Sequence, residues 1–260
     1  MHPILFTVFG HPVYAFGVMI ALAFLLGALW IVQRGKAQGF SEELFLEATL
    51  WIVVSGLVGA RLFYIFFFPA LFFKDPFGVL FNQGGLVWYG GMIAVTLTVW
   101  LFCKRHQIAF NKLGDIVTPP AALGLAIGRI GCLLAGCCYG APCELPWAIQ
   151  YPPGHETFPH HVHPSPLYES ISLLIVTFLL AWIDRYKKFD GATTWLFFVL
   201  YGIVRFVLEY YRGDRLVWLV SLNLSASQVI SLAGIALGLI MLGILVSQKS
   251  TQKKNHRQLI

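Results

Sequence analysis

Charged residues are scarce in this sequence, and long polar segments are missing. Asp, Glu, Lys and Arg make up 12% of the 260 residues, whereas 58% are hydrophobic and the mean hydropathy is +0.73. Soluble domains carry about 25% charged residues, so the composition excludes an ordinary soluble domain and predicts an integral membrane protein. No stretch resembles a soluble domain, a long linker or a repeat.

Common catalytic and targeting motifs are also missing. The sequence has no Walker loop, no Rossmann glycine fingerprint, no G-x-S-x-G elbow and no H-E-x-x-H motif. An enzyme with this sequence must therefore use its substrate's own nucleophile or a simple side chain, and we expect no cofactor. No Lys or Arg precedes the first apolar run and no small-residue cleavage site follows it, so we expect the first span to stay in the membrane.

Apolar runs of about 17 to 25 residues predict an all-α protein with seven transmembrane helices. The predicted spans are 13–33, 44–66, 87–103, 116–136, 167–183, 192–211 and 226–246. They form one membrane domain over residues 1–248, with external loops at 67–86 and 138–166 and a basic cytoplasmic tail at 249–260. Glycine pairs around residues 56–59 and 90–91 predict close helix packing.

Basic residues alternate between the two sides of the predicted helices. Twelve Lys and Arg residues fall in one set of loops and the tail, and three fall in the opposite loops. Because cytoplasmic loops collect these residues, the pattern places the N-terminus outside and the C-terminus in the cytoplasm. The net charge of +6 then matches an anionic membrane surface and requires no nucleic acid partner.

Three arginines lie inside or at the ends of predicted spans: Arg61, Arg129 and Arg205. A charge at the bilayer centre costs about 3 kcal/mol on insertion scales, so such a residue faces a polar cavity, a partner or an anionic ligand. The guanidinium fork suits bidentate capture of a phosphate, which predicts a central lipid-binding cavity. The alternative is a structural ion pair with Glu169 or Glu209.

Two further polar groups accompany these arginines. Tyr201 and Glu209 lie four residues before and after Arg205, so the three residues share one helix face. Tyr168 and Glu169 open the fifth span and are expected to orient the loop above the cavity, with Ser165 as a possible helix cap.

The cysteines and loop histidines raise three alternatives. The pattern Cys132-x4-Cys137-Cys138-x4-Cys143 lacks the paired C-x2-C knuckles of a structural zinc site. Small packing residues or an external disulfide through Cys143 are therefore expected, and a metal site or a redox function is less favoured. We predict no metal.

Several motifs, in order along nearly the whole chain, resemble the prolipoprotein diacylglyceryl transferase family of the bacterial inner membrane. They are Gly84-Gly85-Leu86-Val87-Trp88-Tyr89-Gly90-Gly91, Gly128-Arg129-Ile130-Gly131, Gly136 with Tyr139-Gly140, His163-Pro164-Ser165-Pro166-Leu167-Tyr168-Glu169, and Tyr201-Gly202-Ile203-Val204-Arg205-Phe206 with Glu209-Tyr210-Tyr211-Arg212. The resemblance implies seven helices, no metal cofactor, and transfer of the diacylglyceryl group of phosphatidylglycerol to the lipobox cysteine in the signal peptide of a prolipoprotein.

The resemblance also implies roles for individual residues. Arg129 and Arg205 would hold the phosphatidylglycerol headgroup. The base role of histidine in some members is not carried over to Tyr89, which we regard as a candidate polar or proton-handling group. Supporting positions are Arg61, Gly140, Tyr201, Glu209, Arg212 and Tyr168. Tyr89 stands where some members have histidine, Cys132 where asparagine is usual, and Phe16 where a tyrosine is found. The alternatives are a paralogue acting on another acceptor, a lipid or anion transporter, and a membrane thiol oxidoreductase.

Overall fold

The computed structural model describes residues 3–8, 10–82, 87–213, 215, 217–219 and 223–258. The chain divides into two compact units. Unit one comprises Met1–Trp30 and Gly114–Ile260, and unit two comprises Ile31–Leu113. Each unit is described by itself, and the single membrane domain over residues 1–248 stays a prediction.

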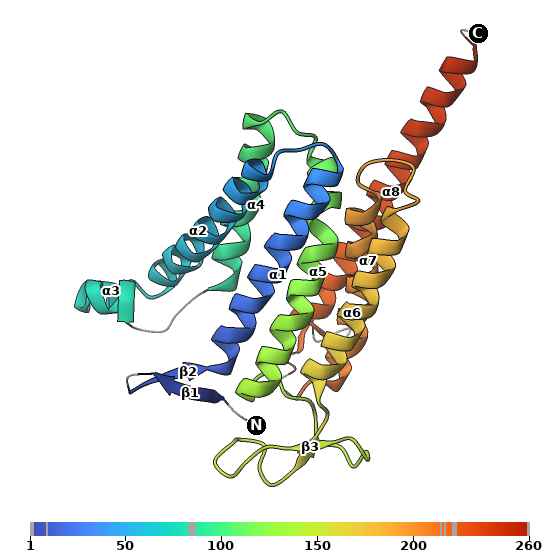
Figure 1. Ribbon diagram of the computed structural model, residues 1–260. Coiled ribbons are helices and arrows are strands. Elements are labelled where there is room, and N and C mark those ends of the chain that lie inside the picture. The colour runs from blue at the N-terminus through green and yellow to red at the C-terminus, as the bar shows by residue number, and fades with distance from the viewer. Residues whose placement is uncertain are drawn as a thin grey trace. The chain divides into compact units, whose positions relative to one another are not determined.

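Long helices occupy all seven of the predicted spans (Figure 1). They are α1 (Ala15–Ala37), α2 (Glu42–Phe67), α4 (Trp88–Arg105), α5 (Phe110–Ala135), α6 (Ser165–Asp184), α7 (Ala192–Leu208) and α8 (Ala226–Gln258). Within the described residues, all of these except α4 are long and apolar enough to cross a membrane. The prediction of a mostly helical, multi-pass membrane protein is confirmed. The seventh crossing, the orientation and the central cavity stay predictions.

Several short elements were not predicted from the sequence. They are the hairpin of β1 (Ile4–Val8) and β2 (His11–Tyr14), helix α3 (Pro69–Lys74), the π-turn η1 (Gly78–Asn82), the strand pair β3 (Ile149–Gln150) and β4 (His161–Val162), the 3₁₀ turn η2 (Glu209–Tyr211), and the strand pair β5 (Val217–Leu219) and β6 (Leu224–Ser225). Proline at the first helical position starts α3, because its missing N–H has no partner there anyway. Helix α8 extends through the basic tail to Gln258.

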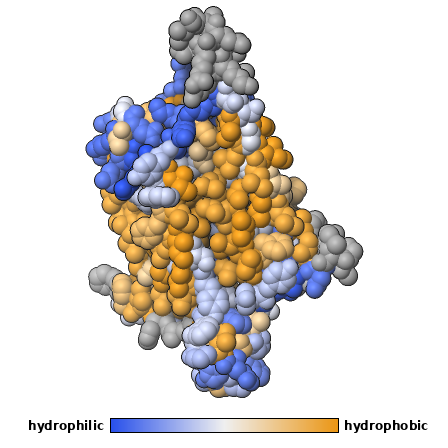
Figure 2. Space-filling model, turned by 90° about the vertical axis from the view of Figure 1, so that its right-hand side faces the viewer, coloured by the Kyte–Doolittle hydropathy of each residue, from blue (hydrophilic) through white to orange (hydrophobic). Residues whose placement is uncertain are grey.

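Several polar side chains of the helices are buried within the apolar core, and many large apolar side chains are exposed. On α6, Glu169, Ser170 and Thr177 are buried, whereas the side chain of Phe178 is 73% exposed. The hydroxyl of Ser170 donates a hydrogen bond to the carbonyl oxygen of Ala126 on α5, 2.9 Å away. Figure 2 shows a broad hydrophobic surface with hydrophilic residues gathered at both ends. Exposed apolar side chains of this kind are suited to contact with lipid tails.

Helices α2 and α4 lie side by side in unit two and meet through glycine (Figure 1). A β-carbon added to Gly59 would come within 2.6 Å of the carbonyl oxygen of Gly90, and one on Gly91 within 3.1 Å of that of Gly56. Larger residues would therefore force the helices apart. The prediction of close packing at these glycines is confirmed.

A buried carboxylate joins α5 to the start of α7 in unit one. Asp115 is fully buried, and its two oxygens accept hydrogen bonds from Thr194 N at 2.9 Å and Gly191 N at 2.8 Å. Lys187 Nζ also lies 2.8 Å from this carboxylate. A negative charge at a helix N-terminus is favourable because the first N–H groups of the helix are unpaired. Asp115 therefore fixes the two helices at the end opposite Arg129, about 21 Å away along α5.

Replacing Asp115 with alanine is expected to destabilise the protein without changing residues near Arg129. The substitution removes the partner of the amide groups at the start of α7 and one of the two carboxylates that Lys187 contacts, the other being Asp184, at a cost on the order of 3 kcal/mol. Thermal unfolding in detergent measures this loss. The matched control is Asp190→Ala, because Asp190 is exposed. Equal unfolding temperatures for the two variants would contradict the assigned role.

Candidate functional site

Polar side chains gather in unit one where α5 and α7 end and where α6 and α8 begin. These helices lie side by side in Figure 1, with their four ends on the same side as β3. We call this cluster the arginine network and define it by eight residues. They are Arg129, Glu169, Tyr201, Arg205, Glu209, Ser225, Ser227 and Gln228.

The first half of the arginine network joins α5, α6 and α7. Arg129 Nη2 lies 3.0 Å from Glu169 Oε1, and the hydroxyl of Tyr201 donates a hydrogen bond to the same oxygen at 2.9 Å. The side chain of Glu169 is 6% exposed and that of Arg129 is 23% exposed. The ion pair offered as an alternative for Arg129 is therefore present. Tyr201, which the sequence placed in a stripe with Arg205, bonds across to α6 instead.

The second half joins α7 to the start of α8. Arg205 Nη2 lies 2.8 Å from Glu209 Oε2 and donates a hydrogen bond to Ser227 Oγ at 3.2 Å. Ser225 Oγ donates to Glu209 Oε1 at 2.7 Å and accepts from the backbone N–H of Gln228 at 3.2 Å. Glu209 is thus held from both sides. The i,i+4 pairing of Arg205 with Glu209 is confirmed.

Both arginines keep donor groups that their carboxylate partners do not use. Arg205 Nη1 is buried and has no hydrogen-bond partner among the described residues. Among the described residues, Arg129 Nη1 donates to a weak acceptor, Cys138 Sγ, at 3.8 Å. Burying an unpaired donor costs about 1 to 3 kcal/mol, so a ligand that accepts hydrogen bonds is favoured at this place.

The charges of the network and its neighbour favour an anion. Arg212 Nε lies 3.9 Å from Glu209 Oε2, which adds a third guanidinium beside the two carboxylates. Three guanidinium groups therefore pair with the two carboxylates, and Arg215 Nη2 adds a fourth where it donates to Gln228 Oε1 at 3.2 Å. An excess of positive charge in a largely buried place complements an anionic phosphate diester.

Gly140 and Arg212 belong to a junction of three loop segments next to the network. The two residues form an antiparallel bridge, and the backbone N–H of Gly140 donates to the carbonyl oxygen of His163 at 3.0 Å. A β-carbon on Gly140 would lie 2.6 Å from Ser165 Oγ, so any larger residue would push the segments apart. Ser165 does not cap α6 as proposed from the sequence. Its hydroxyl donates to the carbonyl oxygen of Tyr211 at 3.0 Å and closes the junction.

Tyr168 attaches the 138–166 loop to the first turn of α6. Its hydroxyl accepts a hydrogen bond from Trp147 Nε1 at 2.7 Å and lies 3.2 Å from His163 Nδ1. Its ring meets the ring of Tyr211 edge to face. This geometry agrees with the expected role of Tyr168 in orienting the loop.

Arg61 and Tyr89 lie in unit two, so their positions are described separately from the network. Arg61 is on α2 and is half-buried. The backbone N–H of Val87, just before α4, donates to the carbonyl oxygen of Ala60 at 3.1 Å. The start of α4 therefore lies next to Ala60, the residue that precedes Arg61. The side chain of Tyr89 and residues 83–86 lie outside the described residues.

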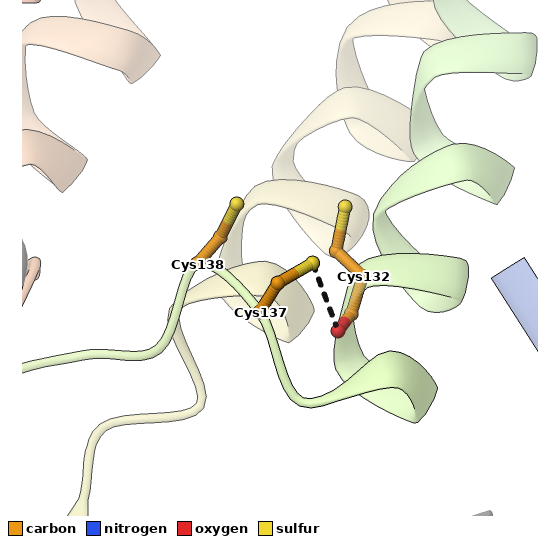
Figure 3. Close-up of side chains that lie close together, drawn as sticks. All are labelled: Cys132, Cys137 and Cys138. Carbon is orange, nitrogen blue, oxygen red and sulfur yellow. Dashed lines mark hydrogen bonds between the residues drawn. The ribbon is translucent and has the colours of Figure 1, made fainter. Parts of the chain in front are cut away.

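Three thiols meet at the end of α5, close to Arg129. The Sγ atoms of Cys132, Cys137 and Cys138 all lie within 4.8 Å of one another, as Figure 3 shows. All five cysteines of the chain are free thiols, so the external disulfide expected through Cys143 is not formed. Hydrogen bonds from the other two thiols lower the pKa of Cys138, and the positive charge of Arg129 adds to this effect while burial opposes it.

Aromatic residues of the 138–166 loop lie over this turn. The rings of Tyr151 and His155 stack with centroids 4.1 Å apart, and His155 Nε2 donates to the carbonyl oxygen of Gly136 at 2.8 Å. Burial raises the pKa of Tyr151 to about 12, with a further contribution from the neighbouring thiols. The loop thus shields one side of the cysteine turn.

The sequence reasoning missed the contribution of α8. Ser225, Ser227 and Gln228 complete the arginine network, and Gln228 is fully buried. A signal was present, because these polar residues stand at the start of the predicted apolar span 226–246. Polar residues at such a position favour a buried partner over a lipid-facing surface.

Comparison with known proteins places this chain in a family. The family model described as prolipoprotein diacylglyceryl transferase matches residues 3–244, which is most of the chain. The chain belongs to this family. Among its relatives, the phosphatidylglycerol--prolipoprotein diacylglyceryl transferase of Clostridium tetani is 35% identical over 94% of this chain and 98% of its own length. The proteins of the same name from Finegoldia magna and Idiomarina loihiensis are 36% and 32% identical, covering 93% and 92% of this chain and 94% and 91% of their own lengths.

In this prolipoprotein diacylglyceryl transferase family member, the residues singled out by the resemblance fall into two groups. Those that the structure brings together in unit one are Arg129, Arg205, Tyr201, Glu209, Arg212, Gly140 and Tyr168. Arg61 and Tyr89 come from unit two. The family and the fold agree with a membrane transferase.

Proposed function

We propose that this chain transfers the diacylglyceryl group of phosphatidylglycerol to the lipobox cysteine of a prolipoprotein. The reaction belongs to lipoprotein maturation and takes place in the bacterial inner membrane. The names of the relatives from three organisms support the substrates. The single observation that carries the proposal within the chain is the arginine network, with its unused donors on Arg129 and Arg205.

The arginine network binds the phosphate of the lipid in this proposal. Arg129 Nη1 and Arg205 Nη1 donate to phosphate oxygens, while Nη2 of each arginine stays on its carboxylate. Glu169 and Glu209 then act as positioning residues, because each fixes the plane of one guanidinium. Tyr201 holds Glu169 from the other side, and Arg212 adds positive charge next to Glu209.

The reaction breaks a carbon–oxygen bond of the lipid and forms a carbon–sulfur bond. The substrate thiol loses its proton, its sulfur attacks the glycerol carbon of the diacylglyceryl group, and glycerol phosphate leaves with the bonding electrons. Negative charge on the leaving phosphate increases as the bond breaks. Arginines that bind this developing charge more strongly than the charge of the intact diester accelerate the step.

The substrate thiol must also lose its proton before it attacks. A thiol is a far better nucleophile after it loses its proton. In the proposal Tyr89 is the polar or proton-handling group and Arg61 is a supporting position, and both belong to unit two. Gly140 and Tyr168 keep the 138–166 loop in place over the substrates. Gly140 forms part of the loop junction through its hydrogen bond to His163, and Tyr168 accepts a hydrogen bond from Trp147.

Replacing Tyr168 with phenylalanine is expected to lower transfer about five-fold. The variant loses the hydroxyl that accepts from Trp147 and contacts His163, and one such hydrogen bond contributes about 1 kcal/mol. Initial rates with phosphatidylglycerol and a lipobox peptide measure the effect. Tyr186→Phe is the control, since Tyr186 is exposed on the segment after α6. Wild-type rates for Tyr168→Phe would contradict its positioning role.

The proposed reaction is tested with the purified protein in detergent. It is mixed with phosphatidylglycerol and a synthetic lipobox peptide, and the peptide is analysed by mass spectrometry. We expect a thioether-linked diacylglyceryl adduct on the cysteine, and no adduct on a peptide in which serine replaces that cysteine. Absence of the adduct, under conditions in which the Clostridium tetani relative forms it, would overturn the proposal.

A further inference from the structure

The three thiols at the end of α5 are not used in the proposed transfer. Cys132 is buried in the last turn of the helix, Cys138 is half-buried and Cys137 is exposed. Figure 3 shows their side chains pointing toward the same side, with Cys137 between the other two. We propose that Cys132, Cys137 and Cys138 form a binding site for a soft, thiol-seeking metal ion such as Zn²⁺.

The helix cap, rather than chance packing, brings the first two cysteines together. The N–H of Cys137 donates to the carbonyl oxygen of Cys132 at 3.1 Å, and the N–H of Gly136 donates to that of Leu133 at 3.3 Å. Gly136 has φ +80°. These are the two hydrogen bonds and the left-handed glycine of a Schellman motif, which places the residue after the glycine against the last helical turn. The spacing Cys-x3-Gly-Cys therefore pairs two thiols through the backbone.

The backbone of Cys138 adds the third thiol to this pair. Its φ is +58°, which is an uncommon, left-handed conformation for a residue with a β-carbon. Such strain concentrates at functional sites, because the surrounding structure must hold it. Here it directs Sγ of Cys138 back toward the other two sulfurs, within 4.8 Å of both.

The distances and the donor set fit a metal ion. Three sulfurs at about 2.3 Å from one Zn²⁺ lie about 4 Å from one another, so the observed separations need only a small closure. Thiolates are soft ligands that select ions such as Zn²⁺ and Cu⁺ over Mg²⁺ and Ca²⁺. Binding of one Zn²⁺ releases the three thiol protons and leaves one negative charge. The guanidinium of Arg129, 3.8 Å from Cys138, offsets that charge.

The site is tested on the full chain in detergent, after the protein has been reduced and freed of metal. The protein then competes with a coloured chelator for Zn²⁺. We expect one high-affinity Zn²⁺ per chain. Zn²⁺ binding should weaken about 100-fold in each of the variants Cys132→Ser, Cys137→Ser and Cys138→Ser. Replacing a metal ligand lowers the affinity at least as much as replacing a residue that holds the ligand in place. Cys143→Ser is the control, since Cys143 lines a separate pocket with Glu144, His160 and His161.

A second measurement on the unaltered chain covers the case in which a variant fails to fold. Free Zn²⁺ at 100 times its dissociation constant should slow alkylation of Cys137 and Cys138 about 100-fold and leave Cys143 unchanged. Failure to bind Zn²⁺, or loss of binding in Cys143→Ser alone, would overturn the proposal. A protein that forms a disulfide between two of the three thiols and binds no Zn²⁺ after reduction would also overturn the proposal. Zn²⁺ binding and formation of the peptide adduct are measured separately, so failure of this proposal is distinguished from failure of the proposed transfer.

Discussion

Replacing Arg129 with alanine is expected to lower kcat/KM for diacylglyceryl transfer by about 10²-fold to 10³-fold. Removal of one preorganised donor from a developing anion has this order of effect in enzymes. The substitution removes the guanidinium that lies 3.0 Å from Glu169 and presents Nη1 on the other side. Arg129→Lys should also be impaired, because a lysine ammonium cannot contact the carboxylate and the phosphate with two separate nitrogens in a fixed plane.

A double variant separates binding from folding for Arg129. Arg129→Ala leaves Glu169 buried without its counter-charge, and this alone destabilises the protein. Adding Glu169→Gln removes the unpaired charge while keeping an oxygen that can accept from Tyr201. We expect the double variant to regain much of the lost unfolding temperature and none of the lost activity. Recovery of activity would show that Arg129 serves only as the partner of Glu169.

Replacing Arg205 with lysine is expected to reduce kcat/KM about 10-fold to 100-fold while leaving the fold intact. Lysine keeps the positive charge beside Glu209, but it cannot reproduce Nη1, the buried nitrogen that has no partner among the described residues. A hydrogen bond to a charged group contributes about 1.5 to 3 kcal/mol, which corresponds to this range of rates. Initial rates at subsaturating phosphatidylglycerol give the ratio.

The control for Arg205→Lys is Arg185→Lys at the exposed end of α6. Both variants keep their charge, so general changes in membrane electrostatics affect them equally. Unfolding temperatures measured alongside the rates confirm that the ion pair with Glu209 survives. If Arg205→Lys were as active as Arg185→Lys, Nη1 of Arg205 would not bind the phosphate.

The helices could be predicted from the sequence because their signal is local. Apolar runs locate each span, and the starts of α5, α6 and α7 lie within six residues of the predicted ones. Arg129 and Arg205 could be found for the same reason, since a charge in an apolar run is visible without knowledge of its partners.

The partners of these arginines depend on packing between helices, which the sequence does not show. Tyr201 shares a helix face with Arg205, yet its hydroxyl reaches Glu169 on α6. Gln228 on α8 donates a side-chain hydrogen bond to the carbonyl oxygen of Phe206 on α7, 22 residues earlier in the chain. The prediction of no metal rested on the cysteine spacing, which lacks the paired C-x2-C knuckles of a structural zinc site. The structure shows that a helix cap can bring the sulfurs of two cysteines five residues apart to within 4.8 Å of each other.

A product balance with isotope-labelled phosphatidylglycerol tests which bond of the lipid breaks during transfer. The lipid carries ³²P in its headgroup phosphate, and it is incubated with the purified protein and a lipobox peptide. We predict one diacylglyceryl peptide for each glycerol phosphate released, with the ³²P of the consumed lipid in the water-soluble product and none on the peptide. Label on the peptide, or glycerol phosphate released without a peptide adduct, would contradict the proposed carbon–oxygen cleavage at the arginine network.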